Sequence, residues 1–298
     1  MIKIFVALIL ALTSITSLPS IAYNAKSQFV EVEISSLDGL MTLFKKHNYT
    51  SNDWKNGDRE VPRLTFEGVS ERWKETSSQI PVKQKKQVFF RLMAPLVLIS
   101  NENILAERNI VKSAPLSSKV ILDIARKYRL LNNETSSLTE KQRQQLLLQV
   151  DVMPPSLALA QAAEESGWAS SRFTEEGNAF FGQWDFSGAG MKPKQQRKEL
   201  GNYGLARFDS PLDSVEGYML NINTTGAYKQ LRVLRAKLRQ ANKAITGLAL
   251  AGTLDKYSER GQAYIDGLRS MIRYNKLEDV DEAYLSETIL IKLISPKQ

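Results

Sequence analysis

The chain has 298 residues, of which 43% are hydrophobic and 24% charged, and its formal net charge is +8. This length and composition are typical of a globular protein of one or two domains and exclude a low-complexity chain. Cysteine is absent and His47 is the only histidine, which excludes disulfides and thiol catalysis and leaves too few ligands for a typical zinc site. We expect no metal and no other cofactor.

The first 22 residues, MIKIFVALILALTSITSLPSIA, are typical of an export signal. One Lys precedes an apolar run, and the small residues Ser20 and Ala22 satisfy the small-x-small cleavage rule. The run is short for a membrane-spanning helix. We expect residues 1–22 to be a signal peptide cleaved after Ala22 and the protein to be exported to a bacterial periplasm or cell envelope. An uncleaved N-terminal anchor is the alternative.

Residues 23–117 are expected to form an N-terminal extension, partly helical and partly irregular. The stretch 23–80 is mixed and rich in loops, although DREVPRLTF indicates extended chain. From Val82 apolar residues recur at spacings of three and four, which predicts a helix. Arg91 inside the apolar run favours a buried helix over a membrane span, and Pro95 should kink or split it.

Local signals for helix starts and stops continue along the chain. Ser118 can cap one helix, and Thr139 with Gln142 resembles a capping box that opens another. Pro155 suits the first turn of a helix that runs to Ser166 and stops at Gly167.

The stretch after this helix differs in character. Residues 187–208 are rich in Gly and Lys and lack helical periodicity, which indicates a loop or short β-hairpin. Ser210 and Pro211 begin a further helix, and three more are expected at about 228–240, 242–251 and 261–274. The sequence therefore predicts a mainly α fold, a helical bundle with a short β-hairpin or loop lobe.

Two acids stand at the end of the helix that begins near Pro155. Glu164 and Glu165 point about 100° apart, and only Glu165 shares a face with small residues, which would leave room for a ligand. The helix dipole and partial burial beside Trp168 would both disfavour its ionised form. A carboxyl group that stays protonated near neutral pH suits a general acid. A solvated pair of surface glutamates is the alternative.

Aromatic residues crowd the stretch that follows these acids. Six fall within residues 168–186, namely Trp168, Phe173, Phe180, Phe181, Trp184 and Phe186. Aromatic rings beside polar groups such as Asn178 and Gln183 are common in clefts that bind saccharides. A small satellite core under the loop is the alternative.

Three blocks of the sequence, in the same order, resemble segments of the family-73 glycoside hydrolases, which are peptidoglycan glucosaminidases. LALAQAAEESGWASSRF…GNAFFGQW resembles their AQAALESGWG…NNLFG signature. FDSPLDSVEGYMLNI and LDKYSERGQAYIDGLRSMI resemble their YxSxxESxxDYxxxL and YATDPxYAxKLxxII segments. The resemblance implies a lysozyme-like α+β domain over residues 118–275, followed by a C-terminal tail at 276–298.

The resemblance also implies roles for individual residues. It implies that Glu165, and not Glu164, is the general acid and that Tyr257 is the essential tyrosine. We expect substrate to be bound by a set of side chains from the aromatic loop and the last block: Trp168, Asn178, Phe181, Gln183, Trp184 and Tyr264.

The second acid of the family has two candidates in this sequence. Many family members carry it on a longer hairpin, whereas the lobe here is short and Glu199 is its only Glu. Asp185 is the alternative. The acetamido group of the substrate could instead assist the reaction, with Tyr257 holding that group.

The resemblance implies an endo-β-N-acetylglucosaminidase that cleaves β-1,4 bonds in peptidoglycan glycan strands. No nucleic-acid module is present, and no specific protein partner is indicated. A muramidase or lytic transglycosylase is one alternative, although these enzymes usually carry a GLMQ-type loop where this chain has AFFGQW. A catalytically weak envelope protein that binds peptidoglycan is another.

Overall fold

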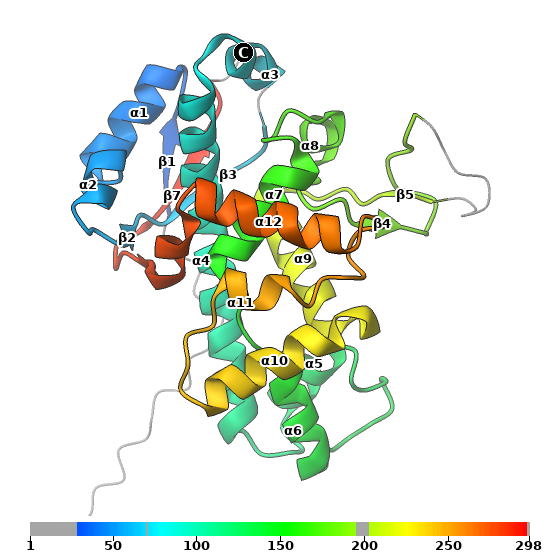
Figure 1. The fold of residues 1–298 in the computed structure, drawn as a ribbon. Coiled ribbons are helices and arrows are strands. Elements are labelled where there is room, and N and C mark those ends of the chain that lie inside the picture. Colours follow the sequence, from blue (N-terminus) through cyan, green and yellow to red (C-terminus); the bar gives the residue numbers. More distant parts are fainter. Residues whose placement is uncertain (1–28, 70, 195–202, 297–298) are drawn as a thin grey trace, which may run out of the picture.

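The computed structural model describes residues 29–69, 71–194 and 203–296. These residues form mainly α-helices, with a few short strands in small sheets (Figure 1). The expected mainly α fold with a small β component is confirmed. Helix α7, drawn green near the centre of Figure 1, carries the two glutamates.

The N-terminal part is more ordered than its sequence indicated. Its elements are β1 (Phe29–Glu33), α1 (Leu37–Lys46), α2 (Ser51–Lys55), β2 (Glu60–Val61), β3 (Leu64–Phe66) and α3 (Glu71–Gln79). Two of the three helices that the sequence did not indicate begin at local caps: Ser36 accepts a hydrogen bond from Gly39, and Thr50 forms a capping box with Asp53. Strands β2 and β3 confirm the extended reading of DREVPRLTF.

The C-terminal segment completes the N-terminal sheet. Strand β7 (Leu290–Ile294) lies between β1 and β3 and is parallel to both, with Phe29 opposite Leu290. Strand β6 (Tyr284–Leu285) pairs with β2. In Figure 1 these blue and red elements lie side by side. The stretch 276–298, expected to be a tail, thus supplies the central strand of a sheet.

Helix α4 (Val82–Ser113) is a single helix that continues through Pro95. It is long and apolar enough to cross a membrane, but 67% of its apolar 18-residue stretch is buried within the protein. Its side chains enter two hydrophobic clusters, with Met93 in the larger one and Leu98 in the one under the N-terminal sheet. We conclude that α4 is the core helix that its sequence predicted and that it joins the two clusters.

The larger body consists of the remaining helices. They are α5 (Lys119–Lys127), α6 (Glu140–Gln149), α7 (Pro155–Ser166), α8 (Arg172–Gly177), α9 (Pro211–Thr224), α10 (Lys229–Gln240), α11 (Gly247–Ala251) and α12 (Gln262–Tyr274), with 3-10 turns at Gly226–Tyr228 and Leu277–Glu282. The capping box at Thr139, the start at Pro155 and the cap at Ser210 are confirmed. Helix α8 falls in the expected aromatic loop, where Ser171 caps it.

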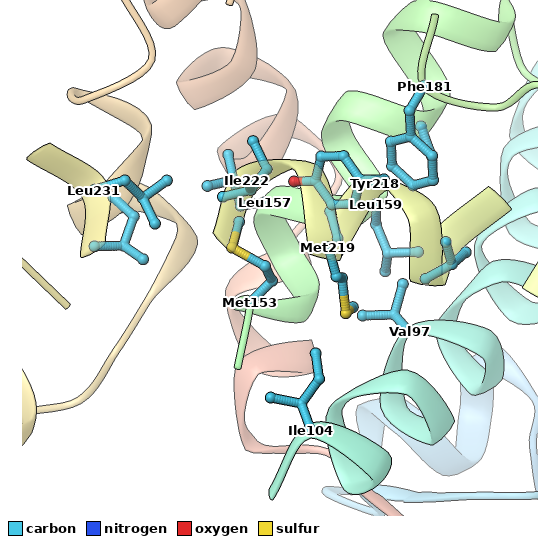
Figure 2. Packing of buried hydrophobic residues seen from close by; sticks show 14 of the residues in the cluster. Val97, Ile104, Met153, Leu157, Leu159, Phe181, Tyr218, Met219, Ile222 and Leu231 are labelled. Carbon is cyan, nitrogen blue, oxygen red and sulfur yellow. The ribbon is translucent and has the colours of Figure 1, made fainter. Parts of the chain in front are cut away.

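Helix α7 is buried along most of its length. It packs against α4, α11, α12 and the 3-10 turn Leu277–Glu282. Figure 2 shows Leu157 and Leu159 among side chains that include Val97 and Met219. The alanines of α7 are almost wholly buried, which allows several helices to approach its backbone closely.

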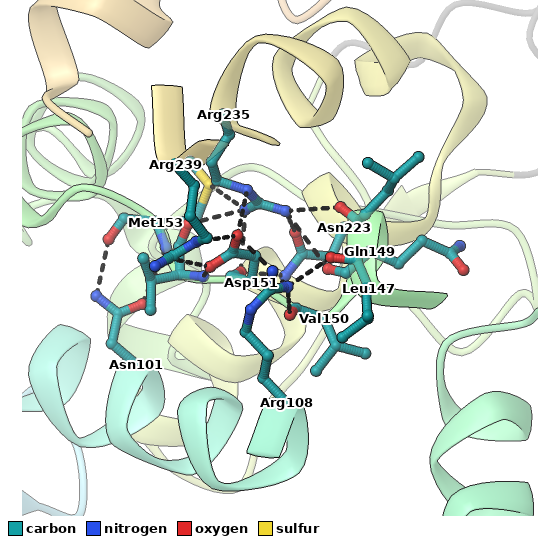
Figure 3. A network of polar contacts seen from close by, with 12 residues as sticks. Asn101, Arg108, Leu147, Gln149, Val150, Asp151, Met153, Asn223, Arg235 and Arg239 are labelled. Atoms are coloured by element: carbon teal, nitrogen blue, oxygen red, sulfur yellow. Dashed lines mark hydrogen bonds and ion pairs between the residues drawn. The ribbon is translucent and has the colours of Figure 1, made fainter. Parts of the chain in front are cut away.

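A buried ionic network fixes the chain just before α7 (Figure 3). Asp151, 1% exposed, accepts two hydrogen bonds from Arg239 and lies within ion-pair distance of Arg108 and Arg235. Arg235, 0% exposed, also donates to Asn223 at 2.8 Å. The cluster therefore ties helices α4, α9 and α10 to the segment that leads into the glutamate helix.

The predicted lobe is a short hairpin. Strands β4 (Trp184–Asp185) and β5 (Gly204–Leu205) are antiparallel, and an isolated bridge joins Met191 to Leu205. A Cβ atom on Gly204 would lie 2.6 Å from the carbonyl carbon of Gly190, so the two backbones touch where they cross. In Figure 1 the hairpin projects from the helical body on the side opposite the N-terminal sheet.

Candidate active site

Glu165 lies in the last turn of α7, which ends at Gly167 in the left-handed conformation. Its Oε1 atom accepts a 2.9 Å hydrogen bond from the hydroxyl of Tyr264. Burial raises the pKa of the Glu165 carboxyl above its usual value; the Tyr264 hydrogen bond and the charge of Arg260 oppose this rise, and Glu164 adds to it. The carboxyl therefore keeps its proton to a higher pH than an exposed glutamate.

The neighbouring acid has a different environment. Glu164 is exposed and forms a 2.7 Å ion pair with Arg260. The guanidinium of Arg260 in turn lies 5.2 Å from the centre of the Tyr264 ring. The two glutamates thus face different surroundings, as expected from their 100° separation on the helix.

The two tyrosines from the last sequence block lie together beside Glu165. The rings of Tyr257 and Tyr264 are stacked, with centres 5.5 Å apart and planes 7° apart. The hydroxyl of Tyr257 donates to the main-chain carbonyl of Phe181 at 3.0 Å. Burial, Tyr264 and the Glu165 carboxyl all raise the pKa of Tyr257, so its hydroxyl stays protonated.

The loop after α8 passes over the carboxyl of Glu165. Gly182 has a φ of +60°, and a Cβ atom there would lie 3.4 Å from Oε2 of Glu165. Phe181, 2% exposed, stacks on Tyr218 with ring centres 4.0 Å apart. Phe181 therefore supports the loop from within, and Gly182 presents only main chain to the acid.

Two of the expected substrate-binding residues have packing contacts. The Trp168 ring lies edge-on to Phe89 and Phe90, and its carbonyl accepts a hydrogen bond from Trp73. Asn178, the left-handed cap of α8, donates to main-chain carbonyls that include that of Glu67. These contacts join the aromatic loop to α4 and to the N-terminal part, while a role in substrate binding stays a prediction for both.

The hairpin presents aromatic rings to solvent. Trp184 is 49% exposed and stacks on Tyr203 with ring centres 5.0 Å apart, and Phe186 is 66% exposed. The side-chain oxygen of Gln183 is buried and has no hydrogen-bond partner in the described part of the chain. Exposed rings of this kind are available for stacking on sugars.

The two candidates for the second acid are Glu199 and Asp185. Glu199 lies outside the described residues. Asp185 accepts two hydrogen bonds from Ser187, which lower the pKa of its carboxyl. Asp185 is therefore ionised, as a base requires, although its hydrogen bonds also serve the turn at Ser187.

One expectation about α7 is wrong. The small residues beside Glu165 were expected to leave room for a ligand, but Ala158 and Ala162 are 0% exposed, as is Gln161 on the same face. Neighbouring helices occupy that space. Sequence reasoning did not single out Tyr218, and it treated Gly182 only as one of the polar positions of the aromatic loop. The fold places Gly182 beside Oε2 of Glu165 and Tyr218 against Phe181 and Gln161. In the described residues there is no group of three or more potential metal ligands.

Comparison with known proteins identifies the class. Residues 141–277 match the glucosaminidase family model, described as mannosyl-glycoprotein endo-β-N-acetylglucosaminidase. This range contains Glu165, the hairpin and both stacked tyrosines, so the helix-end acid belongs to a glucosaminidase-type glycoside hydrolase domain.

The chain is also 32% identical over 200 residues to "Protein bax" of Escherichia coli strain K12, an alignment that covers 64% of this chain and 70% of that protein. No solved structure matches. The chain therefore belongs to the family of bax-type proteins with a family-73-type glucosaminidase domain.

Proposed function

We propose that the protein is a peptidoglycan hydrolase, an endo-β-N-acetylglucosaminidase that cleaves β-1,4 bonds of glycan strands with Glu165 as the general acid. The observation that carries the proposal is the position of Glu165: partly buried at the end of α7, with Oε1 hydrogen-bonded to Tyr264 and Oε2 beside the main chain of Gly182. The glucosaminidase match over residues 141–277 supports the reaction class.

In the proposed step the O–H bond of Glu165 breaks and its proton moves to the glycosidic oxygen. The bond between that oxygen and the anomeric carbon breaks, and the electron pair stays on the departing oxygen. Water adds to the anomeric carbon and loses a proton to a base. If the base is a second carboxylate and the reaction inverts configuration, the two carboxyl groups should stand about 6.5–9.5 Å apart.

We propose two candidates for that base, Glu199 and Asp185, and a third route in which the acetamido group of the substrate assists. In the third route Tyr257 would hold or polarise the acetamido group. The exposed rings of Trp184 and Phe186 on the hairpin would stack on sugar faces.

We also propose that residues 1–22 direct export, because peptidoglycan lies outside the cytoplasm. The apolar run from Ile4 and the small residues Ser20 and Ala22 support this proposal. N-terminal sequencing of the protein from fractionated cells tests it: a mature chain that begins at Tyr23 supports cleavage, and one that retains Met1 points to an anchor.

The central test compares Glu165→Gln with Glu164→Gln on purified peptidoglycan. Glu165→Gln keeps the shape but removes the transferable proton, so digestion should slow by about 10²–10⁴-fold. Glu164→Gln makes the same carboxyl-to-amide change on an exposed side chain and should stay near wild type. Similar losses in both variants would contradict the assignment of the acid.

The products of the wild-type enzyme identify the bond that is cut. After borohydride reduction, mass spectrometry should find reduced N-acetylglucosamine ends. Reduced muramic ends would indicate a muramidase, and anhydro-muramic ends a lytic transglycosylase. Binding to sacculi without any new ends would indicate a binding protein.

A further inference from the structure

A chain of hydrogen bonds runs through the core to Glu165. The hydroxyl of Tyr218 donates to Oε1 of Gln161 at 2.6 Å, and Nε2 of Gln161 donates to the hydroxyl oxygen of Tyr264 at 3.2 Å. Tyr264 then donates to Oε1 of Glu165 at 2.9 Å. Tyr218 and Gln161 are 0% exposed and Tyr264 is 1% exposed, so water does not compete for these groups.

The order of donors and acceptors in this chain fixes where each hydrogen points. The bond from Tyr218 holds the Gln161 amide with its oxygen toward Tyr218 and its nitrogen toward Tyr264. Because the Tyr264 oxygen accepts from Gln161, its own hydrogen is free to point at Glu165. If that hydrogen turned away it would lose its partner inside the protein, which is costly for a buried hydroxyl.

This arrangement makes the two oxygens of Glu165 unequal. Oε1 is occupied as the acceptor of the Tyr264 hydrogen bond. Oε2 is the atom nearest to the position that a side chain at Gly182 would take, 3.4 Å from an ideal Cβ. Because residue 182 is glycine, the loop places no side chain against Oε2 at this position.

We infer that Gln161 and Tyr218 are positioning residues that hold Tyr264 on Oε1 of Glu165, so that Oε2, beside Gly182, is the oxygen that transfers the proton to the leaving group. This inference rests on the proposed function of Glu165 as the general acid. Neither Gln161 nor Tyr218 touches the substrate; both act through Tyr264.

The pKa of the Glu165 carboxyl reports on this series of hydrogen bonds. The groups that act on it are Tyr264, whose hydrogen bond lowers the carboxyl pKa, Glu164 on the same helix, which raises it, and Arg260 ahead of α12, which lowers it. A variant that disturbs Tyr264 through Gln161 leaves Glu164 and Arg260 in place. It should therefore raise the pKa of Glu165 without changing the charges around it.

The main experiment uses Tyr218→Phe, which removes one hydroxyl and keeps the ring that stacks on Phe181. Without the hydrogen bond from Tyr218, the Gln161 amide can rotate and turn its oxygen toward Tyr264. The Tyr264 hydroxyl would then donate to Gln161 and no longer to Glu165. We expect kcat on peptidoglycan to fall about five- to tenfold, the size of one lost hydrogen bond. KM should stay within about twofold, and the alkaline limb of the kcat profile should move to higher pH.

The matched control is Tyr128→Phe. Tyr128 is 1% exposed, and its hydroxyl donates to Glu107 at 2.8 Å, outside the chain that leads to Glu165. Both variants lose one buried hydroxyl, so a stability effect should be common to them. Only Tyr218→Phe should shift the alkaline limb of the pH profile of kcat.

A second variant tests whether Tyr218 and Gln161 act along one path. Gln161→Met keeps the length of the side chain but removes both hydrogen bonds. If both residues act only through Tyr264, the double variant should be no slower than the slower single variant. Multiplied losses in the double variant would contradict a shared path.

The carboxyl of Glu165 can also be titrated directly, without any catalysis. Its ¹³C resonance is assigned by its disappearance in Glu165→Gln. A higher titration midpoint in Tyr218→Phe supports the positioning of Tyr264 by Gln161 and Tyr218 even if wild-type protein cuts no glycan, in which case the proposed function fails and with it the proton-transfer role of Oε2. An unchanged midpoint and an unchanged pH limb in Tyr218→Phe would overturn the inference.

Gly182→Ala tests the role of Oε2. The added methyl group would contact Oε2, whereas Gly57→Ala imposes a positive-φ strain of the same kind with nothing within 4 Å. We expect a loss of kcat of tenfold or more in Gly182→Ala only, while both variants lose some stability. Equal activity in the two variants would mean that Oε2 is not the delivering oxygen.

Discussion

The hydroxyl of Tyr264 and the carboxyl of Glu165 form a 2.9 Å hydrogen bond between residues 99 positions apart in the sequence. The bond partly offsets the cost of burying an acid, so the carboxyl is held in place while its pKa remains raised. A group of this kind is useful for proton transfer but unfavourable for stability when it is ionised. That conflict leads to a prediction that does not depend on enzyme activity.

We expect Glu165→Gln to stabilise the protein relative to wild type as the pH rises from about 4 to 8. Burial raises the pKa of Glu165 in the folded state, so any favourable contribution of this group is present below its unfolded pKa and is lost as the pH rises through the folded pKa. Melting temperatures of both proteins across this range give the difference. Glu164→Gln controls for the loss of one charge. A difference that does not grow with pH would contradict the prediction.

We expect Asp151→Asn to lower the free energy of unfolding by about 3–5 kcal/mol, because it leaves buried Arg235 without its anion. Urea denaturation at neutral pH measures this loss. Asp123→Asn, which breaks surface pairs with Lys119 and Arg126, should cost far less, because solvent screens exposed ion pairs.

The effect of Asp151→Asn should depend on pH. Burial alone would raise the pKa of Asp151, but the hydrogen bond from Arg239 and the charges of Arg235 and Arg108 outweigh it and hold the pKa below its usual value. The stability that Asp151 contributes is therefore present above its unfolded pKa, about 4, and is lost as the pH falls through the folded pKa. A gap between wild type and variant that is unchanged in acid would argue against an ionised Asp151.

We expect Gly204→Ala to disturb the hairpin without unfolding the helical body. The new Cβ would lie 2.6 Å from the Gly190 backbone, which has no flexible side chain to move aside. Activity on peptidoglycan should fall by tenfold or more, while the far-ultraviolet circular dichroism stays that of a folded helical protein. Gly226→Ala, where a Cβ meets nothing within 4 Å, should resemble wild type. Full activity in Gly204→Ala would show that the hairpin does not shape the site.

We expect Leu293→Ala to destabilise the protein by about 2–5 kcal/mol, the usual cost of removing a buried leucine side chain. Leu293 is 6% exposed in the central strand β7 and belongs to the cluster under the N-terminal sheet. Ile289→Ala, at a position 52% exposed just before β7, should cost less than about 1 kcal/mol. Chemical denaturation of both variants measures the difference. Equal small effects would mean that the C-terminal strand adds little to the fold.

The sequence by itself determined much of the helical framework. The capping box at Thr139, the starts at Pro155 and Ser210 and the stop at Gly167 lie where their residues predicted, because caps and turns depend on neighbours within a few positions. The order of three motif blocks likewise pointed to the glucosaminidase family before any contact was known. Which of two adjacent glutamates is partly buried also followed from helix geometry.

Only the tertiary structure decided how distant segments meet. The N-terminus of α7 has no local side-chain cap, and Asp281 fills that role across 125 positions by accepting hydrogen bonds from Ser156. Strand β7 joins β1 although they lie at opposite ends of the chain. Tyr218 and Gln161 meet in the core in the same way. Such pairings leave no local pattern, because the partner of a buried polar group or of a strand edge is set by the packing of the whole chain.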